Sequence, residues 1–159
     1  MNKKEYDERE GHRFFAAGIF NRIWDLLEKE ERAKHDDETM IHAAHASCYH
    51  WLQVGTGLHH QRGEWMIALV YSVLGVAEAA IRHATRCLEL THEHADLMEG
   101  FDHAFAYECM ARASAVAGRR DDALKYLSLA EKAGEQISGT EDKELFVGEL
   151  NGGDWHGLR

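Results

Sequence analysis

Three histidines lie in the segment 42–50, and their spacing raises the possibility of a metal site. On a helix, His42, His45 and Tyr49 share one face because they recur at three- and four-residue steps, whereas His50 lies toward its edge. Two histidines at i and i+3 can ligate a transition metal when a neighbouring helix supplies a carboxylate. The carboxylates considered for this role are Glu108 and Asp102.

The alternative interpretation is that these histidines form hydrogen bonds between helices or face water. The sequence has no HExxH motif and no cysteine pair at metal-ligand spacing. We therefore expect no cofactor. Binding of a metal or small molecule through His42 and His45, in an enzyme or otherwise, is the alternative function.

The cysteines do not indicate a nucleophilic enzyme. Cys48 lies two residues from His50, but such neighbours point apart on a helix. Cys87 and Cys109 lie on helical faces that look buried, where thiols are usually inert packing groups. The sequence also lacks a Gly-x-Ser-x-Gly elbow, a P-loop and a dinucleotide fingerprint. We expect the protein not to be an enzyme.

The elements that must position these residues are predicted to be helices. The chain of 159 residues contains no proline, which helix interiors exclude, and its apolar residues recur at helical steps. Glycines and N-cap residues mark the breaks, including a capping box at residues 138–141. The predicted helices span about 11–32, 37–54, 61–74, 77–91, 101–117, 121–137 and 140–150.

This pattern predicts one all-α domain over residues 11–150, large enough to bury a core. Residues 1–10 are expected to be a flexible N-terminus and residues 151–159 a flexible tail, although Trp155 could fold back onto the domain.

The chain contains an internal repeat. The segment 68–75 aligns with the segment 111–118, and each ends in a glycine that is followed five positions later by an alanine. Glycine suits a helix end that needs a left-handed residue, and small residues suit the close approach of antiparallel helices. The repeat therefore predicts two equivalent helical hairpins.

The second hairpin resembles the tetratricopeptide repeat. The residues that carry the resemblance are Tyr107, Ala111, Gly118, Ala123, Leu127 and Ala130. It implies a right-handed superhelix of six or seven helices, stacked as antiparallel hairpins, in which the first helix of each pair lines a concave face. The whole chain, notably segments 42–51, 62–65 and 104–108, also resembles small bacterial tetratricopeptide-like proteins of unassigned function, which implies no activity.

The resemblance gives a candidate binding groove. Its register predicts that Arg62, Trp65, Leu69 and Ser72 face inward from one helix, and Phe105, Glu108, Arg112 and Ala115 from another. We add His45 and Trp51 to the candidate groove residues.

Arginine can grip a carboxylate or phosphate with two hydrogen bonds, and aromatic rings supply contact area. We thus expect a binding or scaffold module that recognises a peptide or partner protein. The alternative is that Glu108 and Arg112 pair with each other while Trp65 packs in the core. On the binding hypothesis, Arg112→Ala leaves folding nearly intact.

Charge and composition limit the partners. The net charge of −10 disfavours nucleic acid and anionic membranes, and no apolar run is long enough to span a membrane. Three cysteines without paired spacing and the absence of a signal-like N-terminus predict a cytoplasmic protein. A homodimer closed by Trp24, Trp155 and the last helix is a further expectation.

Overall fold

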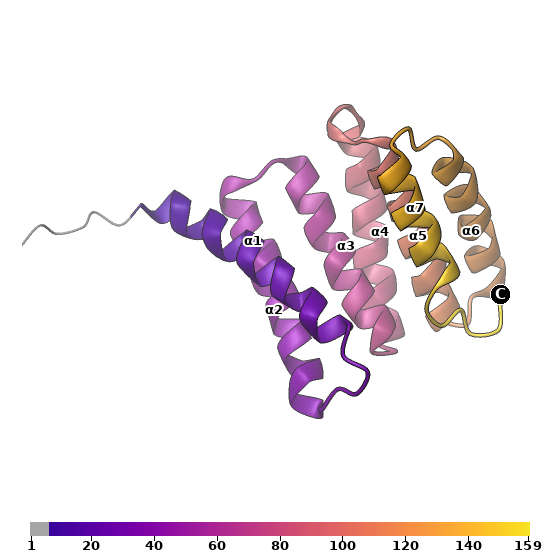
Figure 1. The fold of residues 1–159 in the computed structure, drawn as a ribbon, viewed down its shortest axis with the longest axis horizontal. Helices are drawn as coiled ribbons and strands as arrows, with labels where there is room; N and C mark the ends of the chain where they lie inside the picture. Colours follow the sequence, from indigo (N-terminus) through magenta and orange to yellow (C-terminus); the bar gives the residue numbers. More distant parts are fainter. Residues whose placement is uncertain (1–6) are drawn as a thin grey trace, which may run out of the picture.

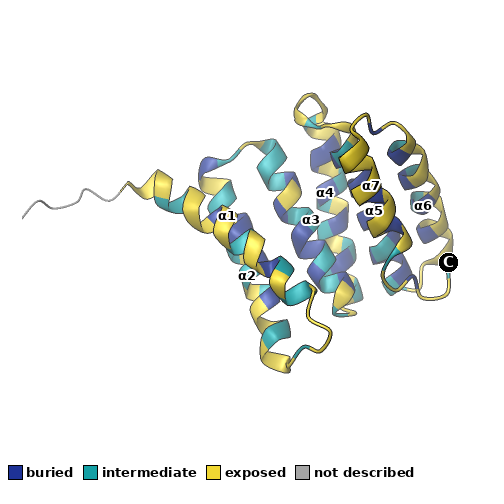
Figure 2. Cartoon of the chain, viewed as in Figure 1, coloured by how far each residue is buried: buried dark blue, intermediate teal, exposed yellow. Residues whose placement is uncertain are grey.

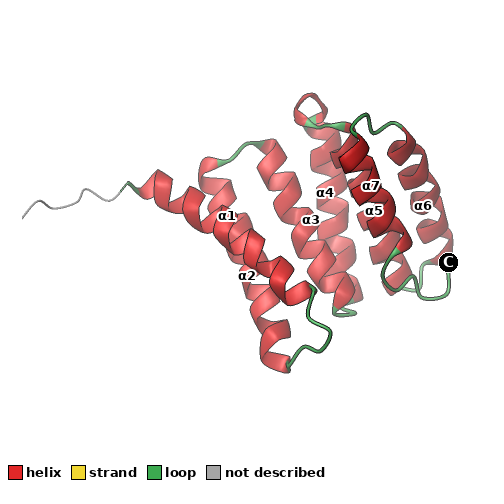
Figure 3. Ribbon diagram, viewed as in Figure 1, coloured by secondary structure: helices red, strands yellow, loops and turns green. Residues whose placement is uncertain are grey.

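Seven α-helices and one short 3-10 helix make up the computed structural model, which describes residues 7–159 (Figures 1 and 3). No strand occurs among those residues. The helices are α1 (Glu8–Leu27), α2 (Lys34–Val54), α3 (Gly57–Val73), α4 (Ala77–Glu93), α5 (Gly100–Val116), α6 (Arg120–Glu135) and α7 (Thr140–Asn151), with the 3-10 helix η1 (Ala95–Leu97) after α4.

Gly75 and Gly118 end the first helix of two equivalent hairpins, α3–α4 and α5–α6, as the repeat predicts. Their φ angles are +73° and +70°, in the left-handed region that favours glycine. The following backbone N–H groups, of Val76 and Arg119, donate to carbonyls of the last helical turn, which is the helix-ending arrangement typical of such a glycine. The pairs α3–α4 and α5–α6 are therefore built alike.

The helices pack as antiparallel neighbours in chain order, and α3 also packs on α5 (Figure 1). The all-α prediction is confirmed, and the stacked hairpins are consistent with a superhelix. Small residues let the central helices approach closely: Ala68 on α3, Ala80 and Ala84 on α4, and Ala113 on α5 are fully buried. Helices α3 and α5 carry the most buried residues, and α1 and α7 are exposed on their outer sides (Figure 2).

The helix boundaries differ most from the prediction at the end of α1 and at the start of α3. Helix α1 ends at Leu27, before the charged segment that the prediction included, because that segment has no apolar residue to bury. Helix α3 begins at Gly57, directly after the break at Gly55, and the Nδ1 atom of His59 accepts a hydrogen bond of 3.0 Å from the Thr56 N–H. This cap starts α3 about one turn earlier than predicted.

Parts of both chain ends that were expected to be flexible are ordered in the structure. Residues 8–10 of the predicted flexible N-terminus belong to α1, and residues 1–6 lie outside the described residues. At the C-terminus, Trp155 is buried, and its indole N–H donates to the Leu150 carbonyl at 2.9 Å. Of the two expectations for the tail, folding back of Trp155 is the one that the structure shows.

Within residues 7–159, no helix is both long enough and apolar enough to span a membrane.

Candidate functional site

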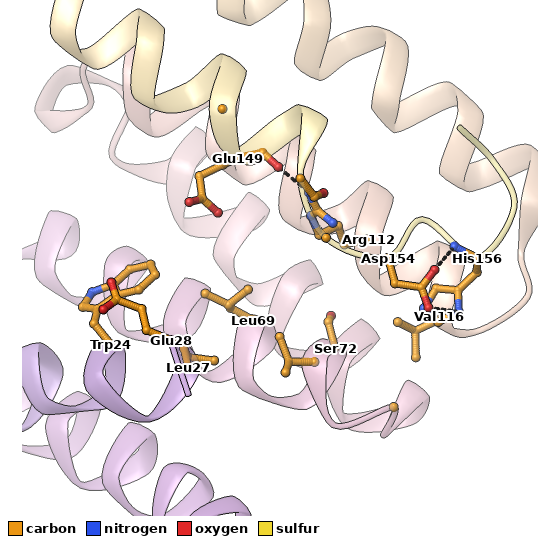
Figure 4. Close-up of a pocket in the computed structure, with 15 residues that line it drawn as sticks. Trp24, Leu27, Glu28, Leu69, Ser72, Arg112, Val116, Glu149, Asp154 and His156 are labelled. Atoms are coloured by element: carbon orange, nitrogen blue, oxygen red, sulfur yellow. Dashed lines mark hydrogen bonds and ion pairs between the residues drawn. The ribbon is translucent and has the colours of Figure 1, made fainter. Parts of the chain in front are cut away.

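Two adjoining hollows run along the face between α1 and α7, with volumes of about 510 and 550 Å³. Both are lined by Trp24 and Glu28 of α1 and by Glu149 of α7, so they form one continuous groove. The floor comes from α3 and α5. Figure 4 shows the first hollow, with Trp24 and Glu28 on one side and Arg112 and Glu149 on the other.

The predicted inward face of α3 forms this floor. Arg62 and Trp65 line one hollow, and Leu69 and Ser72 line the other. These positions are three or four residues apart, so a single side of the helix supplies them. The four α3 residues expected to face inward therefore all line the groove.

Trp65 links the groove to the core through aromatic contacts. Its ring centroid lies 5.9 Å from that of Trp24 and 5.6 Å from that of Phe105, which also lines the groove. Such edge-on and tilted contacts hold large rings in fixed positions. Trp65 thus packs in the core, as the alternative interpretation has it, and at the same time contributes to the groove floor.

Arg62 is held by a carboxylate from α5. Its guanidinium donates to both oxygens of Asp102, at 2.9 and 3.3 Å, and Asp102 also accepts from the Glu99 N–H at 3.0 Å. Asp102 is buried, whereas the Arg62 side chain is 46% exposed. The charge of Arg62 is therefore already paired, although part of the guanidinium reaches the groove.

The Arg112 guanidinium forms an ion pair, hydrogen bonds and a cation–π contact within the protein. It contacts the Glu108 carboxylate, donates to the backbone carbonyls of Glu149 and Gly152 at 2.5 and 2.8 Å, and lies over the ring of Trp155. The prediction that Glu108 and Arg112 pair with each other describes this arrangement. Arg112 lines the groove, but its hydrogen-bonding capacity serves α7 and the tail.

Glu108 is buried beneath the groove floor instead of lining its open part. Burial raises the pKa of Glu108, and the Arg112 guanidinium only partly counteracts this. A gap of about 10 Å³ separates Glu108 and Arg112 from Trp65 and Ser72. Among the described residues, the Trp65 Nε1 and Ser72 Oγ atoms have no hydrogen-bond partner, so the gap has the size and polarity to accept one bridging water.

The histidine-rich helix does not contribute to the groove, contrary to expectation. His45 faces α3 and α4, where its Nε2 lies 3.0 Å from the Tyr71 hydroxyl and its ring lies 5.3 Å from that of His83. Trp51 stacks on His59, with centroids 4.3 Å apart. Both belong to the second helix of the first hairpin, which lies on the outer side of the stack and cannot reach the concave face.

The alternative metal site of His42 and His45 is also not assembled with the carboxylates considered for it. His42 is exposed and lines a separate hollow between α1 and α2, and Asp102 and Glu108 are engaged by the arginines of the groove. Desolvation and the neighbouring His83 lower the pKa of His45, which favours its neutral form.

The walls of the groove are the part that sequence reasoning missed. The register that the resemblance implies concerns α3 and α5 only, whereas α1 and α7 supply the sides of the groove. A signal was present: Phe20, Trp24 and Leu27 recur at helical steps on α1 and remain partly exposed after folding. On α7, Leu145 is 53% exposed and lines the groove.

The rim of the groove is acidic. Glu28, Glu99, Asp142 and Glu149 line it, are exposed, and form no ion pair with any residue that the structure describes. The two arginines of the floor are neutralised by Asp102 and Glu108. The open surface of the groove is therefore apolar at its centre and negatively charged at its edge.

Comparison with known proteins adds no family. No protein-family model matches the chain, and comparisons with curated proteins and with solved structures give no significant match.

Proposed function

We propose that the groove binds an amphipathic segment of a partner protein, with apolar side chains seated between α1 and α7 and basic side chains at the rim. The observation that carries this proposal is the combination of an apolar groove of about 510 and 550 Å³ with four exposed carboxylates at its edge. Aromatic anchors inside a polar rim are typical of protein-recognition surfaces.

The charge of the groove sets the chemistry of the partner. Arg62 and Arg112 are paired within the protein, so they are not free to bind a ligand carboxylate as the sequence suggested. The unpaired carboxylates of the rim instead attract lysine or arginine side chains of a partner. The rim carboxylates and the net charge of −10 both favour a basic partner, and both disfavour a nucleic-acid backbone.

The role is one of binding without catalysis, in a tetratricopeptide-like module of bacterial type. The three cysteines are free and buried, which suits a reducing compartment such as the cytoplasm. A homodimer is not part of the proposal, because Trp155, one of its expected closing elements, is already buried within its own chain.

Selection of phage-displayed random peptides against the purified protein tests the proposal. We expect enrichment of peptides that combine leucine or aromatic residues at helical spacing with lysine or arginine. Enriched peptides without this bias would contradict the charge argument.

Two matched pairs of variants then locate the binding site. Leu145→Ser and Glu149→Lys alter the groove, whereas Val147→Ser and Glu144→Lys change exposed residues of the same helix that do not line it. Losing the contact of one leucine costs about 1.5 kcal/mol, so we expect Leu145→Ser to weaken the selected peptides roughly tenfold. Equal affinity for the groove and control variants would overturn the proposal.

A further inference from the structure

A second group of reactive side chains lies where α2, α3 and α4 meet, and the proposed groove does not use it. His60 and Glu64 are one turn apart on α3, and they lie on the side of that helix roughly opposite Trp65 and Leu69. Cys48 of α2 and His83 of α4 approach them from the two neighbouring helices.

Three of these side chains form a compact set of metal-ligating atoms. The thiol of Cys48, the imidazole of His60 and the carboxylate of Glu64 each offer one ligand atom, and these atoms lie within 4.8 Å of one another. The separation of His60 Nε2 and Glu64 Oε1 is 3.5 Å. Ligand atoms around a tetrahedral zinc ion are about 3.3–3.8 Å apart, given bond lengths of about 2.0–2.3 Å. Small side-chain movements therefore bring the three ligand atoms to the separations that zinc requires.

A fourth residue fixes the carboxylate. The Nδ1 atom of His83 lies 2.5 Å from Glu64 Oε2, which leaves Oε1 directed toward His60. His83 in turn stacks on Tyr71 and contacts His45 edge-on. Hydrogen bonds of this kind hold ligands in the orientation that a metal requires.

A glycine on α3, Gly63, lets the Cys48 thiol of α2 lie close to the α3 backbone. A Cβ atom at Gly63, between His60 and Glu64 in the sequence, would lie 2.7 Å from the Cys48 Sγ atom. Only glycine leaves room for the cysteine at this point. The sequence thus provides a thiol and the space for it beside the two other ligands.

We propose that Cys48, His60 and Glu64 bind a zinc ion, with His83 as the residue that positions the Glu64 carboxylate. Thiolate, imidazole and carboxylate are the ligand types that zinc accepts. The charges of a thiolate and a carboxylate balance the two positive charges of the ion, which suits a site where Cys48 is 4% exposed and the Glu64 side chain 13%. Three protein ligands leave a fourth position for water or a small ligand.

The site differs from the alternative metal site that the histidine spacing of α2 suggests. His42 is not part of it, and His45 is only a neighbour of His83. The signal in the sequence is the i, i+4 pair of His60 and Glu64, but its third ligand lies on another helix, 12 residues before His60.

Zinc binding to protein stripped with a chelator tests the proposal. Titration with zinc chloride, followed by calorimetry, is expected to show one saturable site per chain and a rise in Tm. Cobalt(II) in place of zinc is expected to give a thiolate-to-metal charge-transfer band, which reports the Cys48 ligand in the unaltered protein. No saturable binding, or a cobalt complex without that band, would overturn the proposal.

Variants assign the ligands. Cys48→Ser and Glu64→Gln are expected to lower zinc affinity by more than about 100-fold, and His83→Gln by about 10- to 100-fold because it acts through Glu64. His42→Gln on α2 and Glu78→Gln on α4, both exposed and outside the cluster, are the matched controls and should bind as the wild type does. Circular dichroism checks that each variant is folded. Wild-type zinc affinity in folded Cys48→Ser and Glu64→Gln would place the metal elsewhere and contradict the assignment. If either variant fails to fold, the thiolate-to-cobalt band of the unaltered protein tests whether Cys48 is a ligand.

Discussion

The guanidinium carbon of Arg112 lies 4.1 Å from the centroid of the Trp155 ring, so a residue of α5 is tied to the C-terminal tail. The same guanidinium caps the last carbonyls of α7 through Glu149 and Gly152. These contacts hold one wall of the groove against its floor. Arg112 therefore shapes the groove by positioning α7, and we no longer expect Arg112→Ala to leave folding nearly intact.

Loss of Arg112 should destabilise the protein. Arg112→Ala leaves the buried Glu108 without its partner, and breaking a buried ion pair costs about 3–5 kcal/mol. Urea unfolding followed by circular dichroism measures the loss. Arg82→Ala, which removes an exposed arginine, is the control and should change stability by less than about 0.5 kcal/mol. Equal stability of the two variants would show that the Arg112 contacts do not hold α7.

The pH dependence of stability should carry the signature of Glu108. Burial raises the pKa of Glu108 in the folded state above its ordinary value of 4.5, which applies in the unfolded state. At a pH between the unfolded-state pKa and the folded-state pKa, the folded protein keeps a proton on Glu108 that the unfolded protein has released. In this window the contribution of Glu108 to the free energy of unfolding falls as the pH rises. Below 4.5 both states are protonated and the contribution is constant.

Comparison with Glu108→Gln isolates this term from the other carboxylates. The difference in free energy of unfolding, wild type minus variant, should decrease from acidic to neutral pH. A difference that increases with pH would show instead that Arg112 holds Glu108 ionised and lowers its pKa.

Two glycines should respond to alanine with opposite signs. A Cβ atom at Gly134 of α6 would collide with the ring of Phe146 of α7, so Gly134→Ala is expected to destabilise the protein by about 1–3 kcal/mol. A Cβ atom at Gly18 of α1 meets nothing within 4 Å. Gly18→Ala should then stabilise the protein by about 0.5–1 kcal/mol, because alanine favours a helix interior. Thermal unfolding of both variants checks the pair, and a loss of stability in Gly18→Ala would contradict it.

The three thiols should be unreactive in the folded, metal-free protein. Burial raises the pKa of Cys48 to about 12 and that of Cys109 well above its ordinary value, and Cys87 is fully buried. A thiol reagent at mildly alkaline pH is expected to modify none of them in buffer and all three in guanidinium chloride. Rapid modification of any cysteine in buffer would mean that its helix opens readily.

Local features of the sequence predict the helices and their order along the chain. Apolar spacing, the absence of proline and the glycines at 75 and 118 are local properties, and each acts within a few residues. The inward-facing register comes from the resemblance to the tetratricopeptide repeat, and the residues that it selects include Trp65, Leu69 and Phe105, which line the groove.

Which side chains meet across helices depends on how the helices pack. Arg112 could pair with Glu108 or with a ligand, and only the position of α7 and the tail shows that its hydrogen bonds are used within the chain. Cys48 and His60 come together because α2 and α3 pack at the width that Gly63 allows, a distance that no spacing along one helix encodes. Helical periodicity fixes the direction of a side chain, whereas its partners depend on the packing of the whole stack.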